Sequence, residues 1–177
     1  MNLPRIPLFV CHANCCRSVL AEYLYRSQGG RAFSAGVVAG PELNDRAAAM
    51  LRCWGIDATR HRPRKLTRQL CEDADAIFVM GPLYLARMLE EHGRDLAAKS
   101  YLFADPFDMP AGFTAGEFLV RDPSFDTAPP EELTREFAWF PERVAQIRAS
   151  LEAPPAEPGR LVPASRYLGA LERISRA

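Results

Sequence analysis

The sequence lacks the features that mark exported, membrane-bound and polyanion-binding proteins. In its 177 residues Lys plus Arg equals Asp plus Glu at 22 each, so no excess of charge favours binding to nucleic acid or to a membrane surface. No run of about 18 apolar residues occurs, and residues 1–5 carry no basic region, apolar stretch or cleavage site. We therefore expect a cytoplasmic protein without a nucleic-acid or membrane partner.

The usual patterns of a disulfide framework and of a zinc site are also missing. The cysteines are odd in number and fall at Cys11, Cys15, Cys16, Cys53 and Cys71. This distribution is not that of a secreted disulfide scaffold, so reduced thiols are the default. The first three cysteines and His12 are zinc-ligand types, but a structural zinc site takes two spaced pairs and no second pair follows at a usable distance. We predict that neither a metal nor another cofactor is needed.

What is present is an ordinary globular composition, 48% hydrophobic and 25% charged, in which short apolar strands alternate with amphipathic helices. Strands are predicted over 6–10, 31–35, 74–80 and 99–103. Helices are predicted over 17–28, about 43–54 and 66–72, and from residue 82 onward. This alternation predicts an α/β fold with a parallel sheet and helices on both of its faces.

The second half of the chain is less regular. Residues 104–130 are rich in Asp, Pro, Phe and Gly and are expected to form a long functional loop. Apolar residues from Leu133 to Leu151 then predict a final helix, which Pro141 should kink or split. We place one domain at 1–152, followed at 153–177 by a proline-rich linker and a short amphipathic helix over 165–176. That helix is too small to be stable alone and should dock on its own domain or, by exchange, in a weak homodimer.

The most informative segment runs from Phe9 to Ser18, FVCHANCCRS, at the junction of the first strand and the first helix. A thiol at Cys11 would face the first turn of the helix, where unpaired amides and the helix dipole favour the thiolate and bound anions. Arg17 can grip two phosphoryl oxygens bidentately, and Ser18 can donate a hydrogen bond to the sulfur. Asn14 is a residue type that accepts the left-handed backbone of a tight anion-binding loop. The segment therefore predicts a phosphate-handling nucleophile.

Seven motifs in order resemble those of the low-molecular-weight protein tyrosine phosphatase family, over about residues 6–151. They are the segment 9–18, Ala21-Glu22, Ser34-Ala35-Gly36, 44–47 (NDRA), 61–67 (HRPRKLT), 75–80 (DAIFVM) and Arg121-Asp122-Pro123. The resemblance implies a three-layer sandwich with a four-stranded parallel sheet of order 2-1-3-4. It also implies hydrolysis of phosphomonoesters, most of all protein phosphotyrosine or a small aryl phosphate, through a cysteinyl-phosphate.

The resemblance assigns roles to individual residues. Cys11 would be the nucleophile, Arg17 would bind the phosphoryl group and Asp122 would act as general acid and then base. Asn14, with Ser34 and His61, would hold the loop in shape. Substrate would be bound by His12, Ala13, Asn14, Cys15, Cys16, Ser18 and Phe125. The dipeptide Asp105-Pro106 is a competing acid candidate, but it directly follows the fourth strand, whereas the family pattern places the acid later in the loop.

The chain also departs from the family pattern. Ala13 replaces a usual loop glycine and Val19 a usual proline, Gly81 stands where an aspartate is common, and Ser124-Phe125 replaces a usual pair of tyrosines. The loop at 37–40 lacks the common large aromatic. These departures leave the substrate open.

Three alternatives follow. Phosphoarginine is one possible substrate, because the residue before the second loop cysteine contributes to specificity and is here Cys15. Arsenate reduction would need further neighbouring cysteines, and Cys53 and Cys71 are far apart in sequence. A phosphate-binding protein without turnover would lack the nucleophile, arginine or acid, and none is missing. Cys16 is expected to make the enzyme redox-sensitive by trapping oxidised Cys11 as a disulfide.

Overall fold

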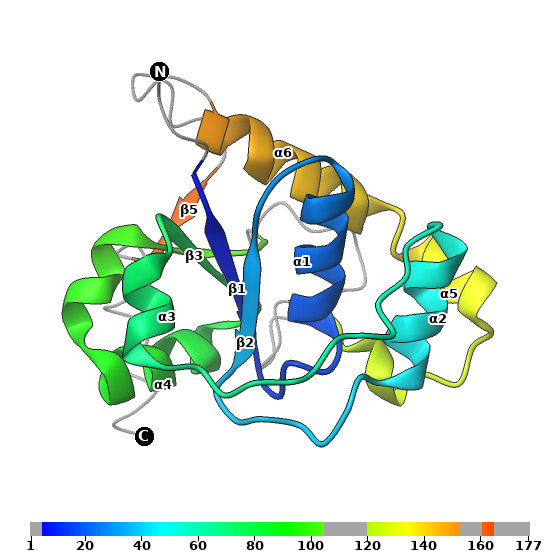
Figure 1. Cartoon of the computed structure of the whole chain (residues 1–177), viewed down its shortest axis with the longest axis horizontal. Helices are drawn as coiled ribbons and strands as arrows, with labels where there is room; N and C mark the ends of the chain where they lie inside the picture. Colours follow the sequence, from blue (N-terminus) through cyan, green and yellow to red (C-terminus); the bar gives the residue numbers. More distant parts are fainter. Residues whose placement is uncertain (1–4, 105–119, 153–160, 165–177) are drawn as a thin grey trace.

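A computed structural model describes residues 5–104, 120–152 and 161–164 (Figure 1). Its sheet has the order β2-β1-β3-β4-β5, in which β1 to β4 run parallel. The strands are β1 (Pro7–Cys11), β2 (Phe33–Gly36), β3 (Ala76–Val79), β4 (Ser100–Leu102) and β5 (Val162–Pro163). The predicted four-stranded parallel sheet of order 2-1-3-4 is confirmed. The added strand, β5, is antiparallel to β4 and lies in the segment where a proline-rich spacer was expected.

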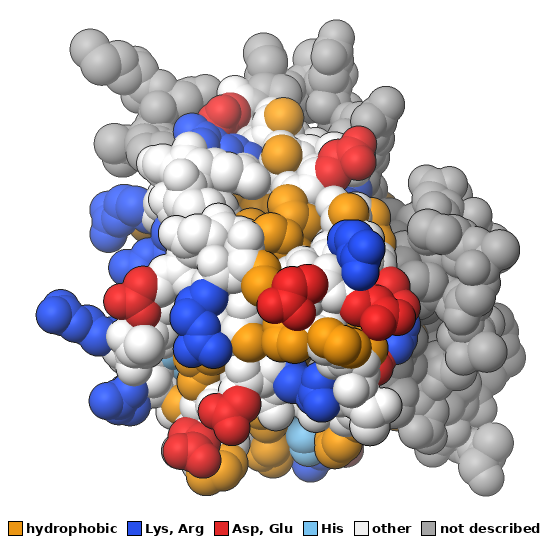
Figure 2. All heavy atoms as spheres, turned by 90° about the vertical axis from the view of Figure 1, so that its right-hand side faces the viewer, with side chains coloured by type: hydrophobic (Ala, Val, Ile, Leu, Met, Phe, Trp, Pro, Cys, Tyr) orange, Lys and Arg blue, Asp and Glu red, His pale blue; other side chains and the backbone are white. Residues whose placement is uncertain are grey.

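Helices cover both faces of the sheet, as predicted. The helices on one side are α1 (Arg17–Ser27), α2 (Asp45–Cys53), α5 (Pro130–Glu136) and α6 (Trp139–Glu152). The other side carries α3 (Arg68–Asp73), α4 (Pro82–His92) and the 3₁₀ turn η1 (Arg94–Lys99). None of the helices in the described segments has the length and apolar character needed to cross a bilayer. The face over α2 and α5 mixes positive and negative side chains (Figure 2).

The core is centred on β1, which is buried along its whole length between its two neighbouring strands. Its continuous apolar run is typical of a central parallel strand covered by helices on both faces. The Phe9 ring lies 5.8 Å from that of Phe78 and 6.1 Å from that of Phe103. This packing fixes the strand whose last residue is Cys11 and so fixes where the following loop begins.

The final helix is divided, but the break does not lie at Pro141. α5 ends at Glu136 and α6 starts at Trp139, so Pro141 falls in the first turn of α6. Backbone amides in that turn have no partner within the helix, so proline is tolerated there. Residues 105–119 of the predicted loop, most of the linker and the predicted helix at 165–176 lie outside the described residues.

Candidate active site

The loop between β1 and α1 lies where the carboxyl ends of the parallel strands meet, the usual place for a ligand in an open α/β sheet. Asn14, in the middle of this loop, is the only residue other than glycine with a positive φ, 54°, in the described part of the chain. Asparagine tolerates this left-handed backbone better than most side chains do. The sequence-based expectation for Asn14 is met by this backbone conformation.

The carbonyl groups of the loop all bond outward or into the helix. The partners of the carbonyls of residues 11–16 are, in order, the amides of Val37, Val38 and Gly40, the ring Nε2 of His61, and the amides of Asn44 and Leu20. Because a trans peptide directs each N–H opposite to the preceding C=O, and no peptide bond among the described residues is cis, the amides of residues 12–17 point the other way. They face a common centre at the N-terminus of α1. This arrangement is an anion site built from main chain.

Two glycines let the segment after β2 approach the loop so closely. A Cβ at Gly36 would lie 2.6 Å from the carbonyl oxygen of His12, and one at Gly40 would lie 3.0 Å from that of Ala13. The approach at Gly36 is too close for any Cβ, so glycine is needed there, whereas a Cβ at Gly40 would require the backbone to shift by a few tenths of an ångström.

The side chain of Asn14 is fully buried and holds the loop from inside. Its Oδ1 accepts from the amide of Arg64 at 3.0 Å, which identifies the other atom as the donor Nδ2. That nitrogen donates to Ser34 Oγ at 2.7 Å and to Ser18 Oγ at 3.1 Å. Ser34 in turn donates to Glu22. The expected contact of Asn14 with Ser34 is present, and Glu22, part of the Ala21-Glu22 pair, completes the network.

His61 supports the same loop residue from its main chain. Its ring Nε2 lies 2.9 Å from the carbonyl oxygen of Asn14, so the nitrogen must donate. Burial lowers the pKa of His61, although the hydrogen bond to Asn14 opposes that shift. His61 therefore braces the loop through this hydrogen bond.

The thiol of Cys11 is 2% exposed, and its Sγ lies 3.0 Å from Ser18 Oγ. Either atom can be the donor while Cys11 is a thiol, but a thiolate has no proton, so Ser18 must then donate to the sulfur while its oxygen accepts from Asn14. A hydrogen bond donated to sulfur stabilises the thiolate, the nucleophilic form. The polar network behind the loop therefore acts on the predicted nucleophile through a single hydroxyl group.

Arg17 is 1% exposed and is held by three groups from distant parts of the chain. Its Nη2 lies 2.7 Å from Asp122 Oδ2 and donates to the hydroxyl of Tyr84 at 3.2 Å, while Nη1 donates to the carbonyl of Val120 at 3.2 Å. Burial opposes the charge, but the attraction of Asp122 and Cys11 raises the pKa of Arg17. The predicted phosphate-binding and acid residues thus meet at one guanidinium.

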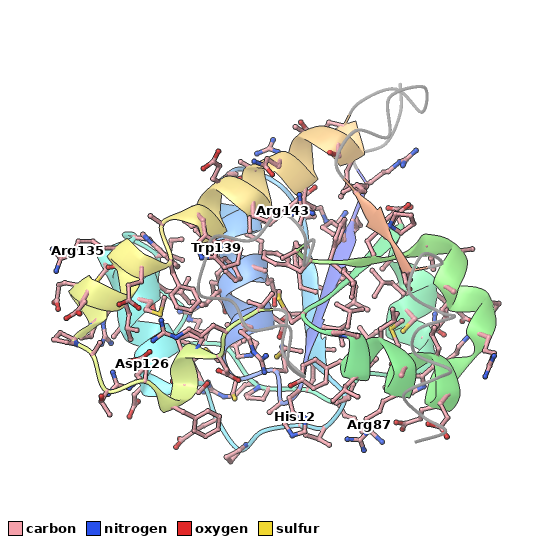
Figure 3. The ribbon with its side chains drawn as sticks, turned by 180° about the vertical axis from the view of Figure 1, so that it is seen from behind. His12, Arg87, Asp126, Arg135, Trp139 and Arg143 are labelled. Carbon is pink, nitrogen blue, oxygen red and sulfur yellow. The ribbon has the colours of Figure 1, made fainter. Side chains whose placement is uncertain are left out.

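Asp122 begins the turn η2 (Pro123–Phe125), and its Oδ1 accepts from the amide of Ser124 at 3.0 Å. Arg121 anchors this turn by ion pairs with Glu136 and with Asp126, which is labelled in Figure 3. Asp105, the competing acid candidate, lies outside the described residues.

Three other residues with a predicted role in substrate binding differ in their exposure to solvent. Phe125 is 89% exposed and is the only large hydrophobic side chain so exposed in the described part of the chain. His12 is exposed, and its ring lies 5.8 Å from that of Tyr84. Cys15 is half-buried, and burial followed by the proximity of Cys11 and Asp122 raises its pKa.

Cys16 is buried inside the loop. Burial, and after it the charge of Asp122, raises the pKa of its thiol well above the ordinary value. Within the described residues no three side chains of His, Cys, Asp or Glu are grouped so as to share a metal ion.

Sequence reasoning missed Tyr84 and Val120 as partners of Arg17. Val120 contributes only its backbone carbonyl group, which a pattern of side chains cannot predict. Tyr84 carries one usable signal, since it lies in the first turn of the helix that follows Gly81-Pro82, at the same edge of the sheet as Cys11.

Comparison with known proteins matches this chain to a protein family. The family model described as "Low molecular weight phosphotyrosine protein phosphatase" matches residues 7–151. A "Probable low molecular weight protein-tyrosine-phosphatase EpsP" of Ralstonia solanacearum is 38% identical over 78 residues, 42% of this chain and 54% of that protein. The "Low molecular weight protein-tyrosine-phosphatase Ptp" of Acinetobacter johnsonii is 36% identical over 77 residues, 41% of this chain and 54% of the relative.

The matched part of the chain thus spans about half the length of these curated relatives. Among solved structures, the "YwlE arginine phosphatase from Geobacillus stearothermophilus" is similar with a TM-score of 0.67 and 26% identity, over 84% of this chain and 94% of that one. The similarities therefore include both a tyrosine and an arginine phosphatase.

Proposed function

Because the chain belongs to the low molecular weight phosphotyrosine protein phosphatase family, we propose that it hydrolyses protein phosphotyrosine through a cysteinyl-phosphate on Cys11. The observation that carries the proposal is the convergence of the amides of residues 12–17 in front of a buried thiol, with Arg17 and Asp122 at the same place. Such donors stabilise charge on the equatorial oxygens of a phosphoryl group in transfer.

In the first step the thiolate of Cys11 attacks phosphorus and the bond from phosphorus to the leaving oxygen breaks. Asp122 is a carboxylate while it pairs with Arg17, so it first takes up a proton from solvent when Arg17 turns to the phosphoryl group. It then gives this proton to the leaving oxygen, and the leaving group departs as a neutral hydroxyl compound. Arg17 and the loop amides bind the three equatorial oxygens throughout. The phosphoryl group must draw Arg17 away from Asp122, and the same movement frees the carboxyl group for proton transfer.

In the second step the Asp122 carboxylate accepts a proton from a water molecule as the water oxygen attacks phosphorus. The sulfur–phosphorus bond breaks, inorganic phosphate leaves and Cys11 returns as the thiolate. The hydroxyl of Ser18, 3.0 Å from the sulfur, stabilises the departing negative charge. One carboxyl group therefore serves as acid and then as base.

Phosphotyrosine is favoured by an aromatic side chain close in sequence to the proposed acid. The exposed ring of Phe125, three residues after Asp122, is placed to contact an aromatic leaving group.

Phosphoarginine is a second candidate, favoured by Cys15, which is half-buried next to Cys11 and Asp122. A thiol at this position is smaller than a branched apolar side chain would be. The similarity of this chain to the solved structure of an arginine phosphatase is consistent with this candidate.

One assay separates the candidates. Phosphotyrosine and phosphoarginine peptides of the same sequence are compared by kcat/KM, with arsenate reduction measured alongside. We expect the phosphotyrosine peptide to be the best substrate. A higher kcat/KM for the phosphoarginine peptide would select the second candidate, and reduction of arsenate without phosphatase turnover would contradict both.

A further inference from the structure

Tyr84 lies against Arg17 on the side of the site formed by α4. The tyrosine is 5% exposed, its hydroxyl accepts from Arg17 Nη2 at 3.2 Å, and its ring centroid is 5.4 Å from Arg17 Cζ. The ring is also 5.8 Å from that of His12. Arg87 belongs to α4, as Tyr84 does, and Figure 3 shows it at the same edge of the molecule as His12. A single side chain thus contacts Arg17 through both its hydroxyl group and its ring.

The two acceptors on Nη2 differ in charge. Asp122 forms an ion pair with Arg17, and a phosphoryl group bound to Arg17 must replace it. Tyr84 is a neutral acceptor. Burial raises the pKa of its hydroxyl, although the charge and hydrogen bond of Arg17 oppose this shift, so Tyr84 carries no charge that would repel the substrate. A neutral acceptor can keep its hydrogen bond while the guanidinium turns its other protons to phosphate.

The ring of Tyr84 supplies the second constraint. A cation facing an aromatic ring within about 6 Å is attracted to it, more strongly when both groups are shielded from water. Burying a guanidinium is costly unless its donors are matched, and a flexible side chain loses rotamer freedom when it is fixed. Contacts that fix the arginine before the substrate arrives reduce the entropy cost of ordering its side chain on binding.

We propose that Tyr84 is a positioning residue that holds the guanidinium of Arg17 in the orientation that binds the phosphoryl group. The inference rests on the proposed function and adds a residue to it. If Tyr84 served only to pack α4 against the sheet, phenylalanine would replace it without functional loss.

The test is the substitution Tyr84→Phe, which keeps the ring and removes the hydroxyl group. Tyr101→Phe is the matched control, since Tyr101 is half-buried on β4 and its ring stacks on Phe78 at 5.4 Å. We expect Tyr84→Phe to lower kcat/KM by about 10-fold or more, the effect of losing a hydrogen bond to a charged group. The loss should be equal for aryl phosphates with good and poor leaving groups, and the inhibition constant of inorganic phosphate should rise in parallel.

Three results would overturn the proposal. Unchanged kinetics in Tyr84→Phe would show that the hydroxyl is not needed. A loss confined to poor leaving groups, with unchanged phosphate inhibition, would show that Tyr84 acts through Asp122 instead. An equal loss in Tyr101→Phe would assign the effect to the removal of any tyrosine hydroxyl. Assays are made below the thermal unfolding midpoint of every variant.

Failure of the proposed function would look different. A wild-type protein that turns over no phosphoester would contradict the phosphatase proposal itself. Calorimetry with inorganic phosphate still tests Tyr84 in that case, because it requires no turnover. Weaker phosphate binding by Tyr84→Phe than by wild type and Tyr101→Phe supports the positioning role, and equal affinities overturn it.

Discussion

Arg17 Nη2 and Asp122 Oδ2 lie 2.7 Å apart, so the residue expected to bind the phosphoryl group is paired with the residue expected to protonate the leaving group. The two residues are 105 positions apart in the sequence. Ion pairs of Arg121 hold the turn that begins at Asp122. In the proposed mechanism, a phosphate ester that enters the loop competes with Asp122 for the same guanidinium. Substrate binding would then release the acid from its ion pair.

This competition predicts that Asp122→Asn binds inorganic phosphate more tightly than the wild type does. Asparagine removes the anion that occupies Arg17 and the repulsion between carboxylate and phosphate. The dissociation constant measured by calorimetry should fall on the order of 10-fold, the scale of one charge-assisted hydrogen bond. Asp95→Asn, an exposed aspartate of η1, is the control and should leave the constant unchanged. Weaker phosphate binding by Asp122→Asn would contradict the competition.

The acid assignment predicts a dependence on the leaving group. Asp122→Asn should slow aryl phosphates with poor leaving groups by roughly 10² or more and affect activated esters far less, because only poor leaving groups require protonation. The measurement is kcat/KM across a series of phenols of increasing pKa. If Asp105→Asn shows that dependence and Asp122→Asn does not, the acid has been assigned to the wrong aspartate.

The loop cysteines predict a reversible redox switch. Mild peroxide should oxidise Cys11, and Cys16 should trap it as a disulfide that a thiol reductant reopens. Burial raises the pKa of Cys16 well above its ordinary value, which disfavours Cys16 as the thiol that peroxide attacks first. Peptide mapping tests the linkage, with Cys53→Ser, on the exposed end of α2, as control. Irreversible inactivation, with no Cys11 to Cys16 peptide, would refute the switch.

His61 predicts a pH-dependent stability. Burial lowers its pKa below the ordinary 6.5, so below that pH the unfolded chain binds a proton that the folded protein resists. The free energy of unfolding should therefore decrease as the pH falls through this value and recover as it rises. Denaturant unfolding of wild type and His61→Gln between about pH 7.5 and about pH 5.5 measures this. The difference in stability between the two proteins should shrink on acidification, and parallel pH profiles would show that His61 contributes nothing.

The sequence predicted the elements that depend on local patterns. The buried strand β1 and the start of α1 at Arg17 follow from an apolar run and from the residues next to it. The conformation of Asn14 follows from its residue type. Pro141 correctly indicated a divided helix. The break itself lies between α5 and α6, because a proline is tolerated in the first turn of a helix and Pro141 falls in the first turn of α6.

What the sequence could not predict depends on contacts between distant segments. The carbonyl groups of the loop accept hydrogen bonds from amides between residues 37 and 44 and from the ring of His61. These pairings depend on the close approach of the backbone at Gly36 to the loop. Tyr84 lies among the apolar positions of α4, where periodicity alone treats it as a core residue. Its role becomes visible only when Arg17 is placed beside it.

The most direct test of the mechanism is detection of the covalent intermediate. Wild-type protein is mixed with an aryl phosphate that has an activated leaving group, quenched in acid during turnover, digested and analysed by mass spectrometry, with Cys11→Ser as control. We predict a phosphoryl group on the Cys11 peptide, a higher occupancy in Asp122→Asn because the second step loses its base, and no turnover in Cys11→Ser. An unmodified Cys11 during turnover, or retained turnover in Cys11→Ser, would contradict the account.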